Sequence, residues 1–183
     1  RAQFVGKSYS VIFNDRITTR NGFSRSRVVD INSGSILYKI KFPIFSLDAH
    51  GTRATSLDFA RLSVFTAEGT YGYAISEAQS RSYLEGEKVS DSDGIWALNP
   101  SSKNSTRRLV ISPRMVVDHL VFNKFEIYSG RQLADTWLYH CVVWLEQPRL
   151  NDEGSRIIFM ARAKCPSSPV HDDLQALQRL PYL

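Results

Sequence analysis

The stretch TWLYHCVVWLE (136–146) is the most apolar run in the chain and holds two of its three tryptophans. Alternate positions are largely apolar on both sides, in the set that begins at Trp137 and in the set that begins at Leu138. A length of about ten residues, with aromatic and β-branched side chains, favours a strand over a helix. A strand with two apolar faces predicts the centre of a sandwich, or a sheet whose outer face meets another subunit.

Other strands are predicted to have one apolar face. SILYKIKF (35–42) alternates apolar residues with Lys39 and Lys41, as half-buried strands do. Strands are also predicted at 8–13, 26–31, 59–66, 70–76, 107–112, 116–128 and 155–163, with polar connections at 46–58, 79–104 and 147–154. These roughly eight strands at hairpin spacing, in a chain of one-domain length, predict an all-β fold. The expected architecture is a single eight-stranded sandwich or jelly roll.

The C-terminal tail has a different periodicity. Ser168-Pro169 supplies a cap and a first-turn proline, and apolar residues then recur at helical spacing. We predict a short helical arm that packs on its own domain or on a neighbouring subunit. Its candidate subunit-interface residues are Val170, Leu174, Leu177, Leu180 and Tyr182.

The net charge of the chain is concentrated at the N-terminus. Residues 1–27 carry six bases against one acid, Asp15, while the other 17 bases are balanced by 17 acids. Such asymmetry indicates either a polyanion partner, most simply nucleic acid, or a solvated basic edge. Phe4, Tyr9, Phe13 and Phe23 lie between these bases, where they could stack on nucleotides or pack in the core. The candidate RNA-binding residues are Lys7, Arg16, Arg20, Arg25 and Arg27.

Motifs for catalysis or metal binding are not found in the sequence. The histidines form no HxxxH or HExxH pair, and no GxSxG, P-loop or dinucleotide fingerprint occurs. The acids of the 79–104 loop could coordinate a divalent cation, but we favour a solvated loop. They are Glu85, Glu87, Asp91 and Asp93. We therefore predict no enzyme activity, no cofactor and no metal site.

The two cysteines, Cys141 and Cys165, are too few for a disulfide framework and suit a reducing compartment. We expect Cys141 in the core and His140 in the core or an interface. No apolar run approaches the about 20 residues of a membrane span, and no signal peptide is visible, so we predict no membrane partner.

Three segments resemble the coat proteins of small plant RNA viruses, most closely the alfalfa mosaic virus and ilarvirus group. FARLSVFTAEGTYGYAIS (59–76) resembles their central hairpin, and HCVVWLEQPRLNDEGSRIIFMARAKCP (140–166) resembles their last two jelly-roll strands and the exit into a C-terminal arm. SILYKIKFPIF (35–45) fits the first jelly-roll strand. Together these segments cover under half of the chain.

The resemblance implies a capsid protein that self-assembles into a shell around single-stranded RNA. It implies three parts: a basic, flexible N-terminal arm over 1–31, a jelly-roll shell domain over 32–166 and a C-terminal arm over 167–183. The expected location is the virion, with the host cell cytoplasm during assembly. Residues 1–27 are less dense in Arg and Lys than the arm of the family, so we expect either that the main part of the arm lies upstream of Arg1 or that the RNA contact is weaker here.

Two other functions fit parts of the sequence. A viral movement protein, or another jelly-roll-derived nucleic-acid-binding module, would share the basic N-terminus without forming shells. A carbohydrate-binding β-sandwich would use Tyr71, Tyr73 and Trp96 to stack on sugars, although the concentrated basic charge argues against it.

Overall fold

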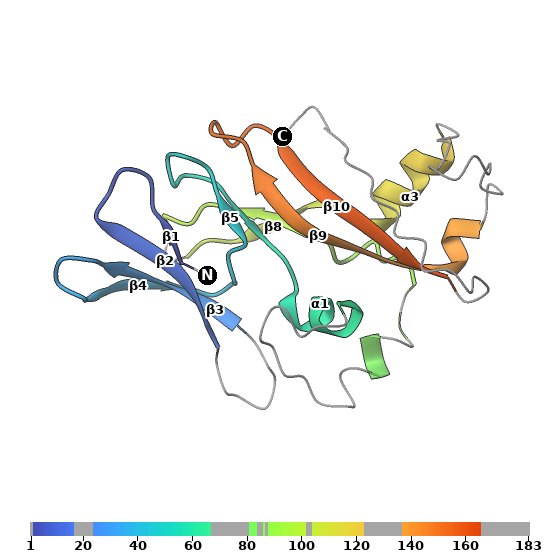
Figure 1. Cartoon of the computed structure of the whole chain (residues 1–183), viewed down its shortest axis with the longest axis horizontal. Coiled ribbons are helices and arrows are strands. Elements are labelled where there is room, and N and C mark those ends of the chain that lie inside the picture. Colours follow the sequence, from blue (N-terminus) through green and yellow to red (C-terminus); the bar gives the residue numbers. More distant parts are fainter. Residues whose placement is uncertain are drawn as a thin grey trace.

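A computed structural model of the chain describes residues 2–16, 24–66, 81–83, 86, 88–101, 104–122 and 137–165. Ten antiparallel strands in this part of the chain form three sheets (Figure 1). The all-β class is confirmed. The eight-stranded jelly roll is not, because the strands are divided into sheets of four, four and two.

The first sheet, which we call the N-terminal sheet, has the order β1-β2-β3-β4 and lies at one end of the molecule (Figure 1). Its strands are Ala2–Phe4, Ser10–Arg16, Ser24–Asp30 and Ile36–Ile40. The predicted strands at 8–13, 26–31 and 35–42 are confirmed. In the segment 1–31, which was predicted to be an arm, the described residues form β1, β2 and β3, and β3 pairs directly with β4.

The second sheet, the middle sheet, has the order β5-β6-β7-β8. Its strands are Ser46–Leu47, Ala54–Ser56, Ile95–Leu98 and Arg107–Ile111. The strand at 107–112 is confirmed, but the predicted connections at 46–58 and 79–104 are wrong because they contain β5, β6 and β7. Strand β6 was missed because its residues are polar. Thr55 and Ser56 are nevertheless fully buried, and the Thr55 hydroxyl lies 2.7 Å from that of Ser46.

The third sheet is the hairpin of β9 (Val142–Leu150) and β10 (Ile157–Lys164). The strand at 155–163 is confirmed. The stretch 136–146 is only partly a strand, because a 3₁₀ helix, η1, spans Trp137–His140 and the Cys141 N–H donates to the Leu138 carbonyl. The connection at 147–154 is wrong at its start, since β9 continues through a bulge at Gln147, whose φ is 52°.

Two helices replace predicted strands. Helix α1 (Phe59–Phe65) follows Asp58, whose carboxylate caps the helix by accepting the Arg61 N–H at 3.1 Å. Its apolar residues recur at a spacing of three and face the core. Helix α3 (Pro113–Phe122) begins after Ser112, whose hydroxyl accepts the Met115 N–H at 3.1 Å. The strand predictions at 59–66 and 116–128 are therefore wrong over their described residues. The predicted strand at 70–76 lies outside them.

Three buried clusters join these elements. One packs the N-terminal sheet on the middle sheet through Ile12, Val28, Ile40 and Leu98. The largest lies between the middle sheet, α1 and the β9–β10 hairpin, and a third lies between α3, η1 and the end of that hairpin. No helix among the described residues is long and apolar enough to cross a membrane.

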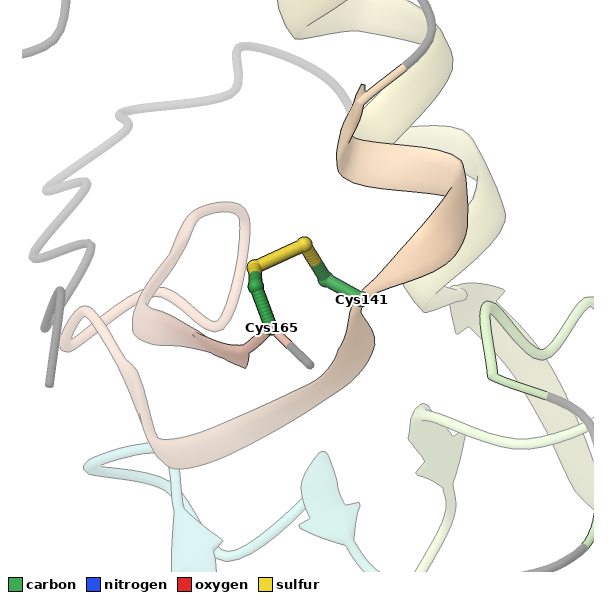
Figure 2. The surroundings of a disulfide bond; sticks show 2 residues. All are labelled: Cys141 and Cys165. Carbon is green, nitrogen blue, oxygen red and sulfur yellow. A yellow bond between two sulfur atoms is a disulfide. The ribbon is translucent and has the colours of Figure 1, made fainter. Parts of the chain in front are cut away.

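The third cluster contains a disulfide between Cys141 and Cys165 (Figure 2). The pairing of Lys164 with Val142 places the two cysteines opposite each other at the open end of the hairpin. Cys141 is in the core, as predicted, whereas His140 is exposed in the chain. This single disulfide was not predicted from the sequence, from which we expect a reducing compartment. A disulfide is instead typical of oxidising compartments.

The loop between β5 and β6 is organised by Asp48, a buried carboxylate. It accepts the N–H groups of Thr52 at 2.8 Å and Arg53 at 3.1 Å, and the Thr52 hydroxyl at 2.7 Å. Burial alone would raise the pKa of Asp48, but these hydrogen bonds outweigh burial and lower it. The ionised carboxylate therefore stabilises the fold above about pH 4, and this contribution is lost as the pH falls through the lowered pKa.

We predict that Asp48→Ala lowers the free energy of unfolding by about 2 kcal/mol at pH 7, because three hydrogen bonds to a buried charge are removed. Urea denaturation at pH 7 and pH 2.5 measures this. The difference in the free energy of unfolding between the variant and the unmodified protein should be smaller at pH 2.5 than at pH 7. An equal difference at both pH values, or an equal effect of Asp152→Asn at an exposed carboxylate of the β9–β10 turn, would contradict this role.

Breaking the disulfide is predicted to lower the free energy of unfolding by about 3 kcal/mol, because it closes a loop of 24 residues in the unfolded chain. Urea denaturation with and without dithiothreitol measures the effect. A Cys141→Ser/Cys165→Ser variant serves as control and should not respond to the reductant. If the reductant leaves the midpoint of the unmodified protein unchanged, the disulfide is absent or contributes nothing.

Candidate nucleic-acid interface

The candidate site is the outer face of the N-terminal sheet. The inner face of that sheet is buried, because Ile12, Val28 and Ile40 pack on the middle sheet. The same inner face is hydrogen-bonded to the chain beyond β4. The Asn14 amide donates to the Ile44 carbonyl and accepts the Ile44 N–H, both at 2.8 Å. Since side chains alternate along a strand, the intervening residues of β2, β3 and β4 point outward.

The strand register arranges these outward residues in rows across the sheet. The first row runs Phe4, Val11, Val29, Ile36 from β1 to β4. The second row runs Ala2, Phe13, Arg27, Lys39, and the third pairs Asp15 with Arg25. The outer face is therefore apolar at one end and charged at the other, with its aromatic rings on β1 and β2 and its bases on β3 and β4.

The bulge in β4 changes one predicted orientation. Val28 pairs with Tyr38 but Val29 pairs with Ile36, so Leu37 has no partner in the ladder. Ile36 therefore lies on the outer side with Val29, and 45% of its surface is exposed. The sequence placed Ile36 on the same side as the buried Ile40, because regular alternation cannot reveal an extra residue.

The charged end contains a shared ion pair. Asp15 accepts the Nε–H of Arg27 at 2.6 Å and that of Arg25 at 3.4 Å, and all three side chains are partly exposed. The hydrogen bond from Arg27 and the charges of both guanidinium groups lower the pKa of Asp15. Asp15 therefore stays ionised at neutral pH and holds both guanidinium groups on this face. With Lys39, the described strand residues of this face include three bases and one acid.

The predicted RNA-binding residues are only partly brought together. Arg25 and Arg27 lie on the outer face, and Lys7 is exposed in the turn between β1 and β2. Arg16 is the last residue of β2, and Arg20 lies outside the described residues. Lys39 was not predicted as a binding residue, although the alternation of 35–42 places it on the face opposite to Ile40. The predicted interface residues of the tail also lie outside the described part.

Arg61 and Asp93 form a second charged group, at which a metal site could be considered. Their side chains make an ion pair of 3.4 Å beside Asp58, which accepts the Tyr83 hydroxyl at 3.0 Å. Burial raises the pKa of Asp93, and the Arg61 charge only partly offsets this effect. Asp93 is thus held by an arginine, and no group of three or more metal-ligating side chains occurs among the described residues.

Trp96, proposed above as a sugar-stacking residue, is engaged within the protein. The Arg107 guanidinium lies 4.2 Å from the centre of its ring and 4.7 Å from that of Phe42. One face of the indole is therefore covered, which weakens the carbohydrate-binding interpretation. Tyr71 and Tyr73 lie outside the described residues.

No protein-family model, curated protein or solved structure matches this chain.

Proposed function

We propose that the protein is a structural capsid protein that self-assembles and binds single-stranded RNA through the outer face of the N-terminal sheet. The observation that carries the proposal is the group of three bases, Arg25, Arg27 and Lys39, on one solvent-facing sheet surface. Cations in neighbouring rows and strands can each neutralise a phosphate along one nucleic-acid strand. The charge excess of residues 1–27 adds long-range attraction.

The all-β class and the likeness of 140–166 to plant-virus coat proteins support the capsid part of this proposal. The likeness of 59–76 to their central hairpin does not support it, because helix α1 occupies 59–65. The segment 35–45 contributes β4 to the N-terminal sheet. Within it, the middle sheet and the β9–β10 hairpin, which share the largest core cluster, are the proposed counterpart of the jelly-roll sandwich. The proposed location is the virion, with assembly in the host cell cytoplasm. The disulfide would then form when particles leave reducing surroundings.

A nucleic-acid-binding module that does not assemble, such as a movement protein, uses the same face. Electron microscopy of the purified protein with RNA separates the two functions. Closed particles support the capsid, whereas binding without particles at any salt concentration supports the module.

Substitutions on the charged end test the RNA contact. We predict that Arg27→Gln and Lys39→Gln each weaken binding of a single-stranded RNA and reduce the slope of log K against log salt by about 0.7, the value for one lost phosphate contact. Fluorescence anisotropy at four salt concentrations measures this. Arg149→Gln, at an exposed base of β9, is the matched control. Unchanged slopes would exclude this face from the phosphate contacts.

Asp15→Asn gives a prediction of opposite sign. Because Asp15 competes with phosphate for Arg25 and Arg27, its neutralisation should strengthen RNA binding and steepen the salt dependence. Asp152→Asn changes the net charge equally, at an exposed carboxylate of the β9–β10 turn, and should have a much smaller effect. Equal effects of the two variants would mean that overall charge, and not this face, governs binding.

A further inference from the structure

The half of the outer face formed by β1 and β2 carries two phenylalanines. Phe4 is 67% exposed, and Phe13 is partly exposed. Phe4 on β1 pairs with Val11 on β2, and Phe13 lies two residues after Val11 on β2. Phe4 and Phe13 are therefore diagonal neighbours on one face. Side chains in that relation are roughly 7–8 Å apart at their backbones, close enough to form one continuous aromatic surface.

The basic side chains of the face lie directly beside this aromatic surface. Arg27 is the cross-strand partner of Phe13, and Lys39 is the partner of Arg27. Neighbouring strands are about 4.8 Å apart, so the cationic groups begin one strand away from the rings. This offset is comparable to the distance between the sugar–phosphate backbone of a nucleotide and its base.

We infer that the outer face of the N-terminal sheet selects single-stranded over duplex nucleic acid. The phosphates lie over Arg25, Arg27 and Lys39 on β3 and β4, while unpaired bases stack on Phe4 and Phe13. This inference rests on the proposed function, since both use the same phosphate contacts. It adds the residues that contact the bases and the strandedness of the ligand.

The preference follows from what each ligand exposes. In a duplex the faces of the bases are stacked on one another, so only phosphates reach a flat sheet, and the rings gain nothing. A single strand can turn its bases onto the rings, and each base–aromatic stack strengthens binding by about tenfold. Because stacking involves no charge, losing a ring should leave the salt dependence unchanged.

The test uses the full chain and two probes, a fluorescein-labelled 12-nucleotide oligouridylate and a 12-base-pair RNA duplex, in anisotropy titrations. The unmodified protein should bind the single strand at least tenfold more tightly than the duplex. Phe4→Leu and Phe13→Leu keep an apolar side chain and remove the ring. Each should lose about tenfold affinity for the single strand, with unchanged salt slope and unchanged duplex binding.

Phe122→Leu, at a phenylalanine of α3 that is 86% exposed, is the matched control and should bind as the unmodified protein does. If Phe13→Leu unfolds, as judged by circular dichroism, Phe4→Leu alone decides. Equal binding of both probes, or unchanged affinity of Phe4→Leu, would overturn the stacking inference while leaving salt-dependent RNA binding intact. Binding of neither probe would overturn the proposed function. Sedimentation velocity measures whether Phe4→Leu still self-associates. If Phe4→Leu loses self-association while its RNA affinity is unchanged, this face is a subunit contact and the inference is overturned.

Discussion

The packing of Ile12, Val28 and Ile40 against the middle sheet determines which side chains of the N-terminal sheet meet solvent. A slip of one residue in strand pairing would turn each apolar side chain outward and each base inward, at a large cost in free energy. The two hydrogen bonds between the Asn14 amide and Ile44 add a second constraint, because they fix the position of β2 relative to the segment that follows β4. The composition of the outer face is therefore a consequence of the core.

Electrostatics on that face differ from what the composition suggests. The N-terminal charge excess suggests a surface of free cations, but Arg25 and Arg27 share one carboxylate, Asp15. A paired guanidinium is held in position and keeps other N–H donors for a phosphate, so the pairing organises the bases and weakens their attraction at the same time. Lys39 contributes a base from a different strand and extends the positive surface across the sheet.

Local alternation predicted the strands at 8–13, 26–31, 35–42, 107–112 and 155–163, and the charge excess of residues 1–27 predicted Arg25 and Arg27 as bases of the site. It failed where short-range chemistry competed with it. FARLSVF reads as a strand until Asp58 is recognised as a helix cap, and Ser112-Pro113 carries the same signal before α3. The strands β5 and β6 are too short and polar for any periodicity, and the Cys141–Cys165 contact depends on a register that only the folded hairpin sets.

Photo-cross-linking of a 4-thiouridine-containing single-stranded RNA to the protein, followed by mass spectrometry of the linked peptides, tests the central claim most directly. The account predicts cross-links in the peptides that contain Phe4 and Phe13, and their loss at high salt. Cross-links confined to peptides of the β9–β10 hairpin or of residues 166–183, with none in β1 to β4, would contradict it.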